Sequence, residues 1–289
     1  MDQKLYEYDL DLTSPIAPAR VVRLVGDGKR VLEVGCSSGA STKVLTSKMN
    51  CRVTGLEINP EAAEVAKRFC DRVITGDIEQ IDLASLLGEA RFDVITFGDV
   101  LEHLRNPLAV LRKVRPFLAD GGCLVVSVPN MAHVSIAFEL LHGRFDYQPK
   151  GLLDDTHVRF FTRKNLLRML EDADFTVTVL ERVEVAPERT EFGTNISTPE
   201  QHAILAYANR HNLEACTYQY VVKAIPVAPG AGLGSSSTAQ VRERLSDLEA
   251  LSHKREREIA ALESKLSWIE SRPPLRAWRW LSRIVGSRK

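Results

Sequence analysis

The sequence predicts an α/β protein built on a doubly wound, mostly parallel sheet of seven strands. Two observations lead to this prediction: short apolar runs typical of buried strands recur over the first 225 residues, and segments with helical character lie between them. Strands that alternate with helices form βαβ units, whose parallel strands are covered on both faces. A length of 289 residues, with 44% hydrophobic and 26% charged residues, suits one such domain with appendages and excludes wholesale disorder.

Five short apolar runs in the first half of the chain are expected to be strands. They are residues 30–35, 51–57, 72–74, 92–97 and 123–128. Helices are expected among them at residues 40–49, 60–70 and 107–118. The second of these helices has Pro60 in its first turn, a position that proline favours. The residues Asp120-Gly121-Gly122 are expected to form a turn before the fifth strand.

The pattern changes after Pro129, although two further strands are expected at residues 175–183 and 217–225. Further helices are expected at residues 134–141, 162–172 and 199–209, the second of them with Thr162 as its N-cap. The segment of about 30 residues between the last two strands, 184–216, is too long for a hairpin turn. We expect it to be a cap or insertion within the domain, which spans residues 1–225.

The sequence beyond residue 225 differs from the domain. Residues 226–238 are rich in Gly, Ser and Pro and predict a flexible linker. In residues 239–271, apolar side chains recur at gaps of four and three, which predicts a coiled coil and hence a homo-oligomer. The alternative is a lone helix that docks on the domain. Residues 272–289 combine tryptophans with basic side chains and predict an amphipathic tail that contacts a membrane surface or packs on the coiled coil.

Charge and cysteine usage limit the possible binding partners and the cellular compartment of the protein. The chain has 38 basic and 38 acidic residues, but residues 272–289 are basic without any acid, so the body is mildly acidic and is not expected to bind nucleic acid. The five cysteines are scattered and predict free thiols in a reducing compartment, with no zinc site. The acidic start and the lack of a long apolar run predict a cytoplasmic protein, peripheral at most to the inner face of a membrane.

The glycine-rich segment Val31-Leu32-Glu33-Val34-Gly35-Cys36-Ser37-Ser38-Gly39 is the strongest indication of a ligand site. Glycines at the end of a strand allow a ligand to approach the backbone, and the following helix presents free N–H groups. Carboxylates follow the next strands, at Glu57, Asp77 and Asp99. All of these groups lie at the carboxyl edge of the predicted sheet, where such folds bind ligands. The dinucleotide pattern G-x-G-x-x-G is absent because Ser37 replaces its second glycine.

Taken together, these segments resemble the class I S-adenosylmethionine-dependent methyltransferases, in particular the subgroup of ubiquinone-pathway O-methyltransferases and bacterial sugar and glycan methyltransferases. The matching segments are VLEVGCSSG (31–39), GLEINP (55–60), GDIE (76–79), residues 92–130 and DDTHVRFFTRKNLLRMLEDADF (154–175). The resemblance covers residues 18–225 and implies S-adenosyl-L-methionine as the cofactor in a Rossmann-like methyltransferase fold.

The resemblance also implies roles for individual residues. Glu33, Gly35 and Gly39 would shape the methionine pocket, and Asp99 would lie near the methionine end. Cys36 and Ser37 of the same loop are also expected to bind the cofactor. Glu57 would bind the ribose hydroxyls, and Asp77 and Ile78 would flank the adenine. The sequence departs from the family in having Cys36-Ser37-Ser38 where a further glycine is common, but serine leaves the backbone N–H groups available.

A weakly acidic acceptor hydroxyl needs a base, and histidine suits this role near neutral pH. His103 follows the fourth strand at the rim of the crevice, and His157 lies in Asp154-Asp155-Thr156-His157, where the carboxylates are expected to orient the imidazole. Either histidine is a candidate base, and either could instead order its loop. We expect Arg159 to pair with Asp155 rather than bind an anionic acceptor, and we expect no bound metal.

The sequence alone leaves three possible functions for the protein. The first is O-methylation of a sugar or glycan intermediate, and the second is the same reaction on a small aromatic or quinone-like metabolite. A deep apolar acceptor pocket would favour the second, whereas an open groove lined by aromatic side chains would favour the first. The third is a non-enzymatic scaffold that recruits partners through its coiled coil.

Overall fold

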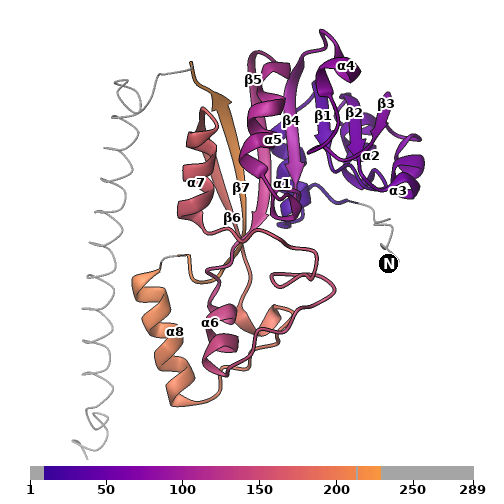
Figure 1. The fold of residues 1–289 in the computed structure, drawn as a ribbon. Helices are drawn as coiled ribbons and strands as arrows, with labels where there is room; N and C mark the ends of the chain where they lie inside the picture. Colours follow the sequence, from indigo (N-terminus) through magenta and orange to yellow (C-terminus); the bar gives the residue numbers. More distant parts are fainter. Residues whose placement is uncertain (1–9, 213, 229–289) are drawn as a thin grey trace, which may run out of the picture. The chain divides into compact units, whose positions relative to one another are not determined.

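A computed structural model of the chain describes residues 10–212 and 214–228, and its centre is one sheet of seven strands (Figure 1). From edge to edge the strands are β3 (Arg72–Thr75), β2 (Arg52–Glu57), β1 (Arg30–Val34), β4 (Phe92–Gly98), β5 (Leu118–Pro129), β7 (Thr217–Pro226) and β6 (Phe175–Glu184). The first five are parallel, and β7 runs antiparallel to both neighbours. The mostly parallel, seven-stranded α/β sheet is therefore confirmed. The flexible linker expected from residue 226 is wrong at its start, because Pro226 ends β7 and the N–H of Val227 donates to the Asp174 carbonyl at 2.9 Å. The rest of the expected linker from residue 229, the coiled coil and the tail lie outside the described residues.

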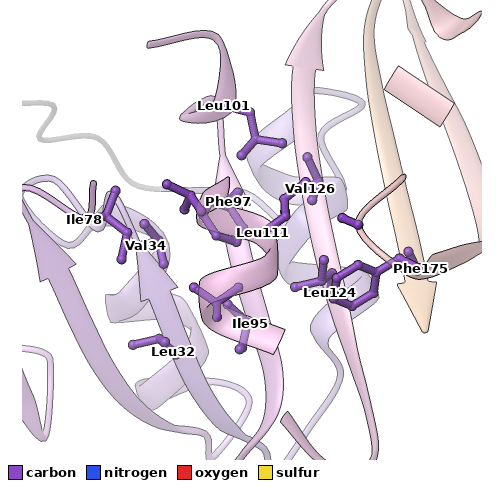
Figure 2. Packing of buried hydrophobic residues seen from close by; sticks show 14 of the residues in the cluster. Leu32, Val34, Ile78, Ile95, Phe97, Leu101, Leu111, Leu124, Val126 and Phe175 are labelled. Atoms are coloured by element: carbon purple, nitrogen blue, oxygen red, sulfur yellow. The ribbon is translucent and has the colours of Figure 1, made fainter. Parts of the chain in front are cut away.

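Helices cover both faces of this sheet because apolar side chains of the inner strands alternate between the two faces. On one face, α4 (Leu83–Leu87), α5 (Pro107–Val114) and α7 (Arg163–Asp172) pack on the larger apolar cluster. Figure 2 shows part of this cluster, where Leu32 and Val34 of β1 lie beside Ile95 and Phe97 of β4. On the other face, α1 (Ala17–Val25) and α2 (Ala40–Ser47) pack on Val31, and α3 (Pro60–Ala66) lies against β2 and β3.

Several element boundaries differ from those expected. The helix expected at 107–118 ends at Val114 and continues as a short 3-10 turn, because Pro116 lacks the N–H that an α-helix needs. The expected turn at 120–122 lies inside β5, where the pairing with β4 slips between Phe92 and Val94 and the extra residues form a bulge. Helices α1 and α4 were not expected; α4 has five residues and an N-terminal cap from Asp82, which is too short for a periodic signal.

Residues 131–160, 185–212 and 214–216 form a smaller lobe beyond the ends of β5 and β6 and before the start of β7, and we refer to them as the lobe. Its helices α6 (Val134–Leu141) and α8 (Pro199–His211) lie next to each other (Figure 1) and share a small apolar cluster. A second cluster in the lobe buries Leu152 and Leu153 beneath the segment that carries His157. The capping box of Thr198 and Gln201 starts α8. Because β6 ends at Glu184 and β7 begins at Thr217, the lobe takes in the whole segment between these strands.

Over residues 10–212 and 214–228, the structure contains no helix that combines the length and the apolar character needed to cross a membrane.

Candidate functional site

The loop between β1 and α2 is held in a shape that requires glycine. Gly35 has φ +74°, and the Val100 side chain occupies the space in which a Cβ of residue 35 would stand. Gly39 has φ +86° and begins α2 with no side-chain cap. Ser37, also in the left-handed region at φ +47°, keeps the backbone curved between them. The loop therefore presents backbone, rather than side chains, to a ligand at the carboxyl edge of the sheet.

Glu57 ties this loop to the end of β2. Its carboxylate accepts hydrogen bonds from the N–H of Ser37 at 2.8 Å and from the N–H of Asn59 at 2.9 Å. The side chain is only 7% exposed, and these two donors stabilise the buried charge. Glu57, the residue predicted to bind the ribose hydroxyls, thus lies beside the glycine loop and also fixes the conformation of that loop.

Asp77 and Ile78 follow β3 on the same edge. Asp77 accepts a hydrogen bond from the N–H of Glu79 at 2.8 Å and shapes the turn after the strand. The Ile78 side chain points into the apolar core beside Val34 (Figure 2). The Ile78 side chain is therefore not free to flank a ligand, and its carbonyl already accepts a hydrogen bond from Nζ of Lys113 at 2.9 Å.

Glu33 is a buried acid inside β1, and its side chain is 8% exposed. Burial raises its pKa to about 7, the nearby charge of Glu57 adds to the rise, and a hydrogen bond from Thr42 opposes it. The Thr42 hydroxyl donates this bond to Oε2 at 2.5 Å. The structure thus brings Glu33 and Glu57 close enough to interact beneath the glycine loop.

Asp99 sits directly after β4, with φ +54°. Its carboxylate accepts hydrogen bonds from the Ser127 hydroxyl at 2.7 Å and from the Gln219 amide at 3.1 Å. Burial raises the pKa of Asp99, while these bonds and the nearby imidazoles of His103 and His157 oppose the rise. Asp99 therefore lies between the glycine loop and the two histidines.

His103 and His157 are brought together although 53 residues separate them in sequence. Their ring centroids are 4.9 Å apart in an edge-to-face arrangement. Nδ1 of His103 lies 3.3 Å from the Thr156 carbonyl oxygen, and Nδ1 of His157 lies 3.4 Å from the Leu152 carbonyl oxygen. A carbonyl oxygen only accepts hydrogen bonds, so in the neutral form of each ring the proton lies on Nδ1 and the basic lone pair on Nε2. Burial, followed by the charge of His103, lowers the pKa of His157, which favours the neutral form.

Two expectations about this segment are wrong. The neighbouring carboxylates do not orient His157: Asp154 instead accepts hydrogen bonds from the N–H and hydroxyl of Thr156, and a backbone carbonyl holds the imidazole. Arg159 does not pair with Asp155, because its guanidinium donates to the carbonyl of Arg105 at 3.0 Å. The Arg159 guanidinium is drawn away by a tertiary contact with Arg105, whereas the contacts that replace a carboxylate at His157 are local ones within residues 152–157.

Among the described residues, one group of side chains could hold a divalent cation. A carboxylate oxygen of Glu102 and ring nitrogens of His103 and His157 all lie within 4.8 Å of one another. Glu102 is 1% exposed, its Oε2 has no hydrogen-bond partner, and burial raises its pKa well above the ordinary value. The donor set suits a borderline metal ion as well as a proton relay.

Sequence reasoning missed the residues that support this site. Ser127 and Gln219 hold Asp99 from β5 and β7, and a polar residue inside the apolar run 123–128 was the available signal for Ser127. Glu191, from the lobe, accepts hydrogen bonds from the N–H of Leu152 and from the hydroxyl of Tyr218. No local pattern indicated Glu191, because its partners come from two distant segments.

The strand order, the glycine loop and the acidic residues that end β2, β3 and β4 define the class I methyltransferase fold. In agreement, the profile of a family described as "Methyltransferase domain" matches residues 11–180, which is more than half of the chain. The chain belongs to this family and is a class I S-adenosylmethionine-dependent methyltransferase, with S-adenosylmethionine as the methyl donor. The buried carboxylates and the backbone cradle at Gly35 and Gly39 fit a cofactor that bears hydroxyl and ammonium groups.

Individual relatives are distant. The chain is 27% identical over 176 residues to "Ubiquinone biosynthesis O-methyltransferase" of Aeromonas salmonicida, which covers 58% of this chain and 73% of the relative. A protein of the same name from Vibrio parahaemolyticus is 28% identical over 154 residues, covering 52% of this chain and 64% of the relative. A solved S-adenosylmethionine-dependent methyltransferase of Thermotoga maritima, described as a possible histamine N-methyltransferase, has a TM-score of 0.50 and 16% identity, covering 73% of this chain and 87% of that chain. This likeness shows the fold alone.

Proposed function

We propose that the protein transfers a methyl group to a hydroxyl oxygen of a small aromatic or quinone-like metabolite, with His157 as the general base and His103 beside it. The observation that carries the proposal is the pair of imidazoles whose Nδ1 atoms face backbone carbonyls and whose Nε2 atoms are left basic. The similarity to proteins named ubiquinone biosynthesis O-methyltransferases supports a small acceptor of this kind.

The chain's own residues account for the chemistry that such a transfer needs. When bound, S-adenosylmethionine supplies a methyl group already activated by a positively charged sulfur. Nε2 of His157 accepts the proton of the acceptor hydroxyl as its oxygen becomes the nucleophile. Asp99, fixed by Ser127 and Gln219, stabilises the imidazolium that results. The segment from 154 to 160 positions the acceptor and excludes water from the crevice.

An exposed group of aromatic rings favours a second candidate acceptor, a sugar or glycan intermediate. Phe145 lies edge-to-face with Tyr147 at 5.7 Å and with Phe160 at 6.4 Å between ring centroids. All three rings are at least 36% exposed, and Phe160 lies three residues from His157. We refer to these three residues as the aromatic patch. Rings in such an open position can stack on the flat face of a pyranose as well as on an aromatic acceptor.

Calorimetric titration with S-adenosylhomocysteine is the first test. The Glu57→Ala variant loses a carboxylate whose charge-assisted hydrogen bonds contribute about 1.5–3 kcal/mol each, so we expect its affinity to fall by about a hundredfold. Glu61→Ala, an exposed position in α3, is the matched control and should bind as the wild type does. Unchanged affinity in Glu57→Ala would mean that the ribose site has been misplaced.

Methyl transfer to a panel of acceptors then decides between the two acceptor classes. Catechol- and hydroquinone-type phenols are tested against nucleotide-linked sugars, with tritiated methyl donor as the readout. Turnover of phenols that is lost in His157→Ala supports the first proposal. Turnover of sugars that is lost in Phe145→Ala supports the second. A folded protein that binds no cofactor at all would favour a non-enzymatic scaffold.

A further inference from the structure

Two cysteines from distant parts of the sequence meet beneath the glycine loop. Cys36 follows Gly35 in that loop, and Cys70 lies after the end of α3. Both sulfur atoms pack against Gly55 of β2, where a Cβ would stand 2.7 Å from Sγ of Cys36 and 2.9 Å from Sγ of Cys70. The two thiols interact, since each shifts the pKa of the other. Gly55 therefore provides the space in which this pair is accommodated.

The two thiols differ in access and in acidity. Cys36 is 3% exposed, whereas Cys70 is half-buried. The contact with Cys36 lowers the pKa of Cys70, and the contact with Cys70 together with burial raises the pKa of Cys36. A thiolate rather than a thiol is the nucleophile in sulfur chemistry, so Cys70 is the reactive member and Cys36 the resolving member.

We propose that Cys36 and Cys70 are a modification site, an oxidisable thiol pair whose closure to a disulfide weakens cofactor binding. A peroxide is the oxidant. The Cys70 thiolate attacks one oxygen of the peroxide, the O–O bond breaks, and Cys70 becomes a sulfenic acid as hydroxide leaves and takes up a proton. The Cys36 sulfur then attacks the sulfenic sulfur, the S–S bond forms, and water leaves with the proton of Cys36. Two thiols and one hydrogen peroxide thus give one disulfide and two waters.

The disulfide alters the cofactor site because Cys36 belongs to the loop backbone that forms it. The two sulfur atoms must approach to about 2.05 Å when they become covalently bonded. The N–H groups of Gly35 and Cys36 donate to the Leu56 carbonyl at 2.7 and 3.3 Å, and the N–H of Ser37 donates to Glu57. Moving Cys36 towards Cys70 disturbs this arrangement. The inference rests on the assignment of the glycine loop to the cofactor.

The test treats the full-length protein with hydrogen peroxide and then maps its disulfides by mass spectrometry of non-reduced peptides. We expect a peptide that joins Cys36 to Cys70, with the loss of two hydrogen atoms. Titration with S-adenosylhomocysteine should then show affinity weakened by about tenfold, the equivalent of one lost hydrogen bond, with recovery after dithiothreitol. If the reduced protein fails to bind at all, the proposed cofactor site is wrong. If both forms bind equally, only this inference is wrong.

Two variants separate the pair from general oxidation. Cys70→Ser keeps a hydrogen-bonding group of similar size, and its affinity should not respond to peroxide. Cys216→Ser removes another half-buried thiol, which lies near Asn209 in the lobe, and should respond as the wild type does. Circular dichroism before and after treatment checks that each protein stays folded. Loss of affinity in oxidised Cys70→Ser, or an oxidised wild type without the Cys36–Cys70 peptide, would overturn the proposal.

Discussion

The buried acid Glu33 makes the stability of this protein depend on pH in a direction opposite to that of most paired carboxylates. Its pKa is about 7 in the folded chain because burial disfavours the charged form, against an ordinary value of 4.5. A group whose pKa is raised on folding contributes stability below its unfolded pKa, and that stability is lost as the pH rises through the folded value. Glu33→Gln keeps the shape and leaves an oxygen that accepts the Thr42 hydrogen bond, but it cannot ionise.

The magnitude follows from the same shift. A rise in the pKa of Glu33 from 4.5 to about 7 means that ionised Glu33 lowers the free energy of unfolding by about 3 kcal/mol. At about pH 5 most of this penalty is absent, and at about pH 8 it is nearly complete. We therefore expect the free energy of unfolding of Glu33→Gln, relative to wild type, to be about 2–3 kcal/mol higher at pH 8 than at pH 5.

Urea unfolding of both proteins, followed by circular dichroism at the two pH values, measures this difference directly. Taking the difference between pH values cancels any constant effect of the substitution on packing. Glu61→Gln, at an exposed position of α3, should show the same offset from wild type at both pH values. If Glu33→Gln behaves in the same way as this control, then Glu33 does not titrate with a raised pKa, and the reasoning from its burial fails.

Three further predictions concern catalysis, the lobe and assembly. The value of kcat/KM should rise with pH through a pKa below the ordinary 6.5 of histidine and then level, because burial lowers the pKa of His157. The His157→Ala variant should lose this rise with pH and about 10²–10⁴ in kcat. The control variant His211→Ala, at an exposed position, should keep the wild-type pH profile and kcat. Glu191→Ala leaves the N–H of Leu152 and the hydroxyl of Tyr218 without their acceptor and should lower the free energy of unfolding by about 1–3 kcal/mol, whereas Glu188→Ala should not. Deleting residues 238–289 should reduce the number of subunits per assembly, measured by light scattering, while the body stays folded. An unchanged number of subunits would refute the coiled coil.

The sheet could be predicted from sequence because its central strands are buried on both faces. Runs such as 30–35 and 123–128 consist almost entirely of apolar residues, so they stand out without any alignment. The helices were predicted less well, since α1 follows an irregular start and α4 has only five residues. Pro116 ends α5 early, and the bulge in β5 depends on pairing with β4, which no local pattern records.

The positions of the glycine loop and of the carboxylates that end β2, β3 and β4 could also be predicted, because they occupy fixed places along consecutive βα units. Their contact with the cofactor stays a prediction. The acceptor side could be predicted only in part. His103 and His157 were identified as candidates, but their contact and the carbonyls that fix their tautomers depend on how the segment 154–160 folds back over residues 101–105. Glu191 depends on tertiary contacts in the same way.

The turn after β4 couples the two halves of the site. Its first residue, Asp99, accepts hydrogen bonds from β5 and β7, and the next, Val100, fills the space above Gly35 in the cofactor loop. Two residues later, the carbonyl of Glu102 accepts the N–H groups of Val158 and Arg159 at 2.9 Å, which anchors the segment that carries the candidate base. A methyl group and a base must be aligned to within a fraction of an ångström for transfer. Because this one short turn contacts both the glycine loop and the segment 154–160, we expect a substitution at Val100 to weaken cofactor binding and methyl transfer together, although its side chain has no reacting group.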